Sequence, residues 1–257
     1  MKKQERIEVF GVKIDNLTKE AAVERVLQGD EPTCLVVTPN AVMLDACRHD
    51  PSLAELLGNA TLSLADGRGV LLLARRQGTP LCERVAGIDF AEALLARAAH
   101  DGLRVFLLGG AQGVAEAAAE RLSVRYPTLC ICGSHHGYFA SDDEDAAVTA
   151  EICASKADIL FVCMGFPRQE AWIVEHLSQL ANVRVAVGLG GSIDVWAGRV
   201  KRAPRLLSAL GLEWAWRMLL EPKRLRVLPG LVRTALYLPP RRTLSAIEKP
   251  EKTNKDI

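Results

Sequence analysis

Residues Val187–Arg226 read VGLGGSIDVWAGRVKRAPRLLSALGLEWAWRMLLEPKRLR, and the fold is decided by how this stretch begins. It starts as a buried strand, opens at Gly188 into a glycine-rich turn and passes an acid, Asp194, before a basic, tryptophan-bearing segment with helical spacing. Glycines after a strand let a ligand approach the backbone closely. Arg and Lys beside Leu and Trp suit phosphates at an apolar boundary. The two halves therefore indicate one substrate that is a nucleotide and another that is carried on a lipid.

The same succession of strand, polar or glycine turn and helix recurs along the chain before this stretch. Short, continuous apolar runs are typical of strands buried in a parallel sheet. Their alternation with helices predicts an α/β fold with a mainly parallel, Rossmann-like sheet flanked by helices, whose ligand site lies at the carboxyl ends of the strands. The expected strands are Ile7–Ile14, Cys34–Thr38, Thr61–Leu64, Arg104–Leu108, Ile159–Cys163 and Val183–Val187. The expected helices are Leu17–Gln28, which is capped by Thr18, one that begins at Ala41, Val70–Arg76, Gly113–Tyr126 and Glu170–Leu180.

Charge is distributed unevenly along the 257 residues, although the formal net charge is only +1. Within residues 199–242, eleven Lys and Arg stand against two acids, a balance of +9 that leaves −8 for the rest of the chain. Such a split predicts a basic surface for phosphate, anionic lipid or nucleic acid, while a solvated pair of basic helices is the alternative. We expect residues 1–198 to form the α/β core, 199–242 a membrane-proximal basic helical appendage, and 243–257 a disordered tail.

Cysteine usage and the start of the chain indicate the compartment. The seven cysteines are odd in number and scattered, and the start MKKQERIEVFG lacks the apolar region of a signal peptide. Both features favour a reducing, cytoplasmic environment. A helix that crosses a bilayer needs about 18 consecutive apolar residues, and Glu213 and Arg217 interrupt the best candidate. We therefore expect peripheral association with the inner face of the cell membrane.

Several short motifs follow one another in a characteristic order. They are, besides the opening stretch, Thr38-Pro39-Asn40, Ala65-Asp66-Gly67, Arg84-Val85-Ala86-Gly87-Ile88-Asp89 and Gly165-Phe166-Pro167-Arg168-Gln169-Glu170. In these residues the sequence resembles the WecG/TagA/CpsF family of bacterial glycosyltransferases, over roughly residues 7 to 226. The resemblance implies an inverting transferase that moves an N-acetylmannosamine-type sugar from a UDP-sugar to the GlcNAc of an undecaprenyl-diphosphate-linked acceptor. The product would be an early intermediate of a surface glycopolymer such as teichoic acid, capsule or enterobacterial-type antigen.

Asp66 is the candidate general base. An acid at the end of the apolar strand Leu62–Leu64, followed by a glycine, is held beside a partly desolvated crevice, where its pKa rises toward that of a usable base. A helix N-cap is the alternative, because Asp caps helices well. The resemblance favours the base, since the acid of this motif is the family's proposed base.

Three polar side chains near strand ends are further candidates for the active site. Thr38 and Asn40 flank a proline that fixes the turn, and their hydroxyl and amide can bind sugar hydroxyls or an N-acetyl group. Turn and cap chemistry is the alternative for both. Gln169 is an uncharged amide without an evident structural duty. The resemblance implies that all three lie in the active site.

The donor and its diphosphate require other residues. Arg84 is a candidate phosphate or carboxylate clamp by its guanidinium geometry, with a surface ion pair as the alternative. By resemblance, Tyr138 borders the uracil and Asp194 accepts its N–H. The glycine turns at Gly109 and at Gly190 and Gly191 are expected to let the nucleotide approach the backbone.

No metal ion and no cofactor are expected. Cys130, Cys132, His135 and His136 could mimic a metal cluster, but the two cysteines at i, i+2 are more typical of one face of a strand. The only Asp-x-Asp lies in the capping box that begins at Ser141, and neither glycine turn fits the dinucleotide fingerprint. We therefore infer metal-independent transfer, in which positive side chains and helix N-termini stabilise the diphosphate.

The basic appendage supplies positive side chains, of which Arg217, Arg224 and Arg226 are expected to act on the diphosphate or on the anionic membrane. Its apolar stripe suits packing against a neighbouring domain or a bilayer, and Trp214 and Trp216 favour the bilayer interface. It could also be buried in a homo-oligomer. A non-catalytic protein that binds nucleotides or nucleic acid through this appendage is the alternative function, but the interleaved aromatics of a nucleic-acid-binding motif are missing. The donor could equally be UDP-glucose or UDP-N-acetylmannosaminuronic acid.

Overall fold

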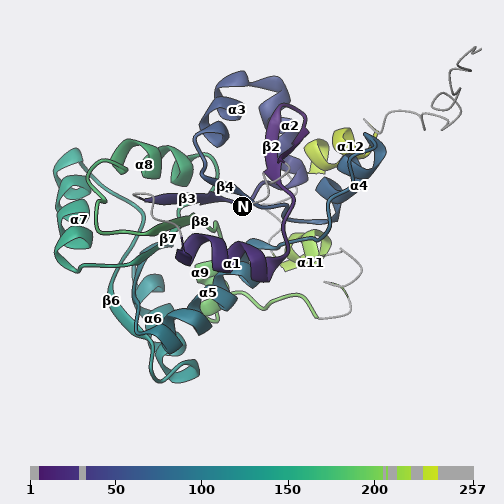
Figure 1. Cartoon of the computed structure of the whole chain (residues 1–257). Helices are drawn as coiled ribbons and strands as arrows, with labels where there is room; N and C mark the ends of the chain where they lie inside the picture. The colour runs from purple at the N-terminus through teal and green to yellow at the C-terminus, as the bar shows by residue number, and fades with distance from the viewer. Residues whose placement is uncertain (1–5, 29–32, 205–206, 208–212, 221–227, 237–257) are drawn as a thin grey trace, which may run out of the picture.

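The computed structural model describes residues 6–28, 33–204, 207, 213–220 and 228–236. Six strands form one sheet in the order β4-β3-β8-β7-β5-β6, and every neighbouring pair is parallel (Figure 1). This arrangement confirms the predicted α/β fold. The strands are β3 (Cys34–Val37), β4 (Leu62–Ser63), β5 (Arg104–Gly109), β6 (Cys130–His135), β7 (Ile159–Cys163) and β8 (Val185–Gly188).

Helices cover both faces of the sheet, which explains why the central strands are apolar throughout. Val36 packs into the hydrophobic cluster on one face, whereas its neighbours Leu35 and Val37 pack into the cluster on the other. The first face is covered by α1 (Lys19–Gln28), α5 (Gly87–Asp101), α6 (Val114–Arg125) and α9 (Ser192–Trp196), and the second by α2 (Ala41–His49), α3 (Pro51–Gly58), α4 (Arg68–Arg76), α7 (Asp142–Ala154) and α8 (Arg168–His176).

The expected single strand Ile7–Ile14 is instead a hairpin. Strands β1 (Arg6–Val9) and β2 (Val12–Asp15) pair antiparallel with each other and form a separate two-stranded sheet. The turn places Phe10 at φ 53° and Gly11 at φ 80°, and glycine reaches this left-handed region without strain. The hairpin packs against the second face of the main sheet.

Local signals set several helix ends as expected. The hydroxyl of Thr18 accepts a hydrogen bond from the amide of Ala21 at 3.2 Å and so caps α1. The hydroxyl of Ser141 accepts from the amide of Glu144 at 3.2 Å and starts α7. Helix α8 begins at Arg168 and ends at His176, so the expected span to Leu180 was too long. Helices α3 and α5 were not expected.

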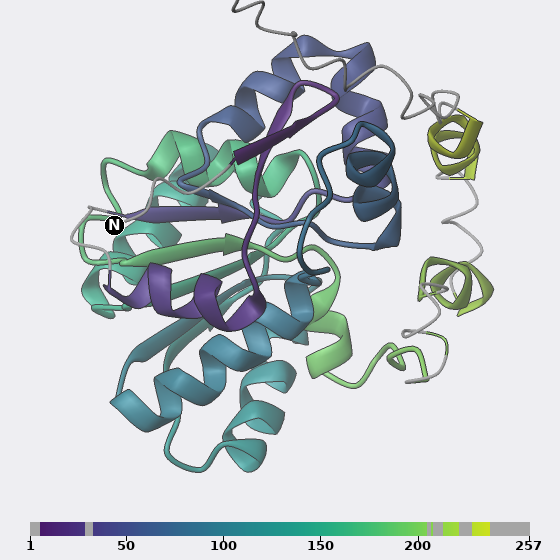
Figure 2. The ribbon, with the colours of Figure 1, turned by 45° about the vertical axis from the view of Figure 1, so that its right-hand side comes forward.

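Two described helices belong to the basic appendage. They are α11 (Glu213–Leu220) and α12 (Leu228–Leu236), and they lie on the side of the molecule toward which the sheet strands point (Figure 2). Helix α12 packs beside α2, where the Arg233 guanidinium lies 2.8 Å from the Asp45 carboxylate. The indole of Trp216 donates to the carbonyl of Lys201 at 3.1 Å. Among the described helices, none is long and apolar enough to span a bilayer. The expected tail, residues 243–257, lies outside the described residues.

Candidate active site

The carboxyl ends of β3, β4 and β8 bring the first candidate residues together. The hydroxyl of Thr38, just after β3, donates to the carbonyl of Gly188 at the end of β8 over 3.4 Å. The amide of Asp66, beyond β4, donates to the carbonyl of Pro39 at 3.0 Å. Parallel strands end at one edge of a sheet, so residues far apart in the chain meet there.

Asp66 is not the N-cap of the helix that follows it. Helix α4 begins at Arg68, and its N-cap position is occupied by Gly67 at φ 94°. The Asp66 side chain is half-buried. Gly67 therefore takes the N-cap position that was the alternative for Asp66, and the Asp66 carboxylate lies half-buried at a strand end.

Asn40, in contrast, caps a helix, which was the structural alternative to a role in binding sugars. It is the N-cap of α2, and its side-chain oxygen accepts hydrogen bonds from the amides of Val42 at 3.0 Å and Met43 at 3.2 Å. The carboxamide nitrogen is not part of this cap. Asn40 can therefore offer a substrate its N–H groups while its oxygen holds the helix.

Gln169 was expected to have no structural duty, and that expectation is wrong. The side chain is 4% exposed. Its oxygen accepts from the amides of Gly165 at 3.0 Å and Gly190 at 2.8 Å, and its nitrogen donates to Glu170 at 2.8 Å. Gln169 thus joins the loop after β7 to the loop after β8.

Arg84 lies beside the end of β4, because the amide of Val85 donates to the carbonyl of Ala65 at 2.9 Å. Its half-buried guanidinium lies 3.5 Å from the Asp89 carboxylate and 3.7 Å from that of Glu213 in α11. Arg84 therefore forms an ion pair, which was the alternative to its role as a phosphate clamp. Arg202 of the appendage pairs with the same Asp89, so body and appendage share a charged network.

The ends of β5, β6 and β7 are linked by backbone hydrogen bonds. The amide of Gly110 donates to the carbonyl of Cys163 at 3.1 Å, and the amide of Gly137 donates to the carbonyl of Gly110 at 3.1 Å. These bonds place Tyr138 at the same edge as the glycine turns. The Tyr138 side chain is 66% exposed, and the Arg168 guanidinium lies 5.6 Å from its ring centre. An exposed aromatic beside a cation is a suitable surface for a base with an attached phosphate.

The glycines of the two turns serve different purposes. Gly109 has φ 136°, and a Cβ there would lie 2.4 Å from the carbonyl oxygen of Cys163, so close strand packing already requires glycine. Gly190 has φ 53° with open space around it, and Gly191 is the N-cap of α9. Asp194 is half-buried on α9, and its carbonyl accepts from the amide of Arg199 at 2.9 Å. Glycine is therefore required at position 109 by packing, whereas Gly190 leaves open space beside its backbone for a ligand.

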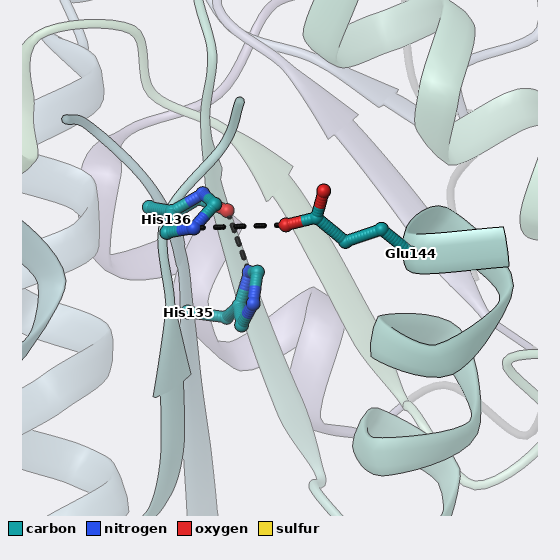
Figure 3. A group of neighbouring side chains, drawn as sticks. All are labelled: His135, His136 and Glu144. Atoms are coloured by element: carbon teal, nitrogen blue, oxygen red, sulfur yellow. Dashed lines mark hydrogen bonds and ion pairs between the residues drawn. The ribbon is translucent and has the colours of Figure 1, made fainter. Parts of the chain in front are cut away.

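His135 and His136 meet Glu144 beyond β6, close enough for one metal ion (Figure 3). Neither cysteine belongs to this group. The amide of Tyr138 donates to Nδ1 of His136 at 3.3 Å, which assigns the proton of the neutral ring to Nε2, 3.7 Å from Glu144. Glu144 also accepts from the amide of Ala140 at 2.6 Å. The proton on Nε2 would have to leave before His136 could bind a metal ion through that nitrogen, and Glu144 already takes part in the capping box of α7.

Two cavities lie away from most of the strand-end residues. One of about 470 Å³ has Arg84 and Asp89 in its wall, and one of about 750 Å³ lies between α5, α6 and α9. Thr38, Asp66 and Gln169 line neither. Arg224 and Arg226 lie outside the described residues, as does the side chain of Arg217, so their roles stay predictions.

Sequence reasoning missed the burial of Glu170, which was expected only as the first residue of a helix. Its side chain is 0% exposed. A signal was available, because Glu170 and Ile173 are three residues apart and so share one face of the helix. The pairing of Arg202 with Asp89 has no comparable sequence signal, since the partners are separated by most of the core.

Comparison with known proteins shows which family the chain belongs to. Residues 7–244 match the glycosyl transferase WecG/TagA/CpsF family. A protein of Staphylococcus aureus strain MRSA252 is 36% identical over 224 residues, which cover 86% of this chain and 87% of the relative. It is named N-acetylglucosaminyldiphosphoundecaprenol N-acetyl-beta-D-mannosaminyltransferase. Proteins of the same name from strains NCTC 8325 and COL show the same identity and coverage. The chain therefore belongs to the WecG/TagA/CpsF family of glycosyltransferases.

Proposed function

We propose that this glycosyltransferase moves an N-acetylmannosamine-type sugar from a UDP-sugar to the GlcNAc of an undecaprenyl-diphosphate-linked acceptor. The observation that carries the proposal is the meeting of Thr38, Asp66 and the Gly188–Gly191 turn at neighbouring strand ends. This edge offers a hydroxyl, a half-buried carboxylate and an open glycine turn. The names of relatives that are 36% identical supply the sugar and the acceptor.

In the proposed reaction Asp66 acts as the general base. It takes the proton of the acceptor's 4-hydroxyl as that oxygen attacks the anomeric carbon of the donor. The bond from this carbon to the diphosphate oxygen breaks, and UDP leaves with the electron pair. A single displacement from the opposite face inverts the anomeric configuration. Thr38 and the amide nitrogen of Asn40 orient the sugars through hydrogen bonds.

Positive charge stabilises the departing UDP in this proposal. Arg84 lies beside the end of β4, and Arg217, Arg224 and Arg226 of the appendage add to it. Tyr138 and Asp194 hold the uracil at the other strand ends. In the described part of the appendage, the exposed apolar side chains include Trp214, Leu219, Leu228 and Val232. They support docking of the appendage on the inner face of the membrane, where the lipid acceptor lies.

The test is UDP release by the purified full chain, measured with and without a lipid-diphosphate GlcNAc acceptor. UDP-N-acetylmannosamine, UDP-glucose and UDP-N-acetylmannosaminuronic acid are supplied in parallel, and the lipid product is identified by its mass. We expect acceptor-dependent release with the first donor. Binding of UDP without transfer from any donor would favour the non-catalytic alternative and contradict the proposal. Transfer from another donor would keep the reaction class and correct the sugar. The proposed product is an early, lipid-linked intermediate of a surface glycopolymer.

A further inference from the structure

Glu170 is the most deeply buried carboxyl near the candidate site, and the reaction proposed above does not use it. One oxygen, Oε1, accepts a hydrogen bond from Gln169 at 2.8 Å. The other, Oε2, is buried and has no hydrogen-bond partner among the described residues. A buried polar atom without a partner costs free energy, so such a group calls for an explanation.

The contact with Gln169 determines which way that amide points. Both Gly165 and Gly190 present backbone N–H groups to it, and an N–H can only be met by the amide oxygen. The nitrogen of Gln169 therefore faces Glu170, which accepts its hydrogen bond. Removing this acceptor would leave a buried N–H without a partner and remove the reason for the amide's orientation.

The surrounding backbone leaves little room for another arrangement. A Cβ on Gly188 would lie 2.7 Å from the Gln169 nitrogen and 3.0 Å from Oε1 of Glu170. The pair therefore fits directly against the end of β8. Gly190 itself has open space beside it, and its amide is held by the hydrogen bond to Gln169, while the neighbouring Leu189 is held by the core and by its amide's bond to Val162.

We propose that Glu170 is a positioning residue, whose carboxyl holds the Gln169 amide so that it fixes the Gly190 turn for the nucleotide of the donor. The inference rests on the proposed function, because it takes the turn between Gly188 and Asp194 as the nucleotide side of the site. Glu170 touches no substrate in this account. It acts through one side-chain amide on two backbone N–H groups.

Two substitutions separate positioning from simple core packing. Glu170→Gln keeps an oxygen that can accept from Gln169, whereas Glu170→Leu fills a similar volume without an acceptor. We expect Glu170→Leu to weaken UDP binding, measured by calorimetry, by about tenfold, since one buried N–H loses its partner. Glu170→Gln should bind UDP within about threefold of the wild type. The KM for the lipid acceptor should stay unchanged in both variants.

Hydrogen exchange at the Gly190 amide supplies a readout that needs no activity. Glu170→Leu should exchange this amide faster than the wild type, and Glu170→Gln should not, while thermal unfolding shows that both variants are folded at the temperature of the measurement. Unchanged UDP affinity and unchanged exchange in Glu170→Leu would overturn the proposal. If Glu170→Leu does not fold, Glu170→Met serves instead, and failure of both to fold would assign Glu170 to stability and overturn it as well.

The controls keep this inference distinct from the proposed function. If the wild type binds UDP but transfers no sugar, the proposed reaction fails while the exchange at Gly190 still decides the role of Glu170. If transfer by the wild type is normal and Glu170→Leu does not change the hydrogen exchange of the Gly190 amide, the proposed reaction is supported and the positioning role of Glu170 is contradicted.

Discussion

The guanidinium of Arg84, beside the end of β4, lies 3.7 Å from the carboxylate of Glu213 at the start of α11. This ion pair joins the basic appendage to the edge of the sheet where the candidate residues gather. A phosphate that entered here would meet Arg84 already facing an acid of the appendage. The appendage and the strand ends therefore lie side by side in the fold, although they are distant in the sequence.

Arg84→Lys tests whether this arginine acts as more than an ion pair. Lysine keeps the charge and loses the forked geometry that matches a phosphate. We expect turnover to fall by about 10², with unfolding free energy changed by less than about 1 kcal/mol, because the ion pairs of Arg84 are partly exposed. Glu213→Gln is the matched control and should keep its turnover. Normal turnover of Arg84→Lys in steady-state assays would reduce Arg84 to a structural partner.

Removal of the residues after Pro204 tests the division between core and appendage. The shortened chain keeps all six strands of the sheet, as well as Arg202 with its partner Asp89. We expect it to fold and bind UDP but to lose transfer, because Arg217, Arg224 and Arg226, which are proposed to stabilise the departing diphosphate together with Arg84, are gone. The lost pair between Arg233 and Asp45 should cost little stability, since the Arg233 side chain is half exposed.

Thermal unfolding of the shortened chain is compared with the turnover of an Arg224→Ala, Arg226→Ala double variant of the full chain. The double variant should also lose transfer while staying folded. An unfolded shortened chain together with a fully active double variant would show that the appendage only completes the core.

Gly109→Ala tests the packing of β5 against β7. At φ 136°, with a Cβ 2.4 Å from a backbone oxygen, alanine combines backbone strain with a contact that cannot relax easily. We expect a loss of about 3 kcal/mol in the free energy of unfolding, measured with denaturant. Gly78→Ala is the matched control, because Gly78 has φ 85° in open space, and it should lose only about 1 kcal/mol. Equal losses in the two variants would refute the close-packing argument.

Glu170 should make stability depend on pH. Burial raises the pKa of Glu170 above its ordinary 4.5, although the hydrogen bond from Gln169 opposes the rise. Below 4.5 the carboxyl is neutral in both states. As the pH rises from there through the raised pKa, the folded protein keeps a proton that the unfolded chain releases, so the free energy of unfolding falls.

Denaturant unfolding over a pH series checks this expectation. The wild type should lose stability relative to Glu170→Gln as the pH rises above 4.5, and the difference should level off above the folded pKa. The Cys47 thiol, which is coupled to Glu170, has its pKa raised to about 11, mainly by burial, and does not titrate in this window. Glu175→Gln, an exposed change on the same helix, should run parallel to the wild type. Parallel curves for Glu170→Gln would show that Glu170 is not neutral when folded.

The parallel sheet could be predicted because a strand buried on both faces must be apolar throughout, as Leu35, Val36 and Val37 are. The hairpin at the start could not be separated from one long strand, because apolar residues alternate on both sides of Phe10 and Gly11. The duty of Gln169 was hidden for a different reason. One of its partners, Gly190, lies 21 residues away, and only the neighbouring ends of β7 and β8 bring them together.

Asp66→Asn is the most direct test of the central claim, that this carboxylate is the base of a sugar transfer. Asparagine keeps the shape and one acceptor oxygen of the side chain, and it removes the proton-accepting power. We expect acceptor-dependent UDP release to fall by about 10² or more, with the thermal unfolding midpoint and UDP affinity unchanged. Near-normal release by a folded Asp66→Asn protein would contradict the account.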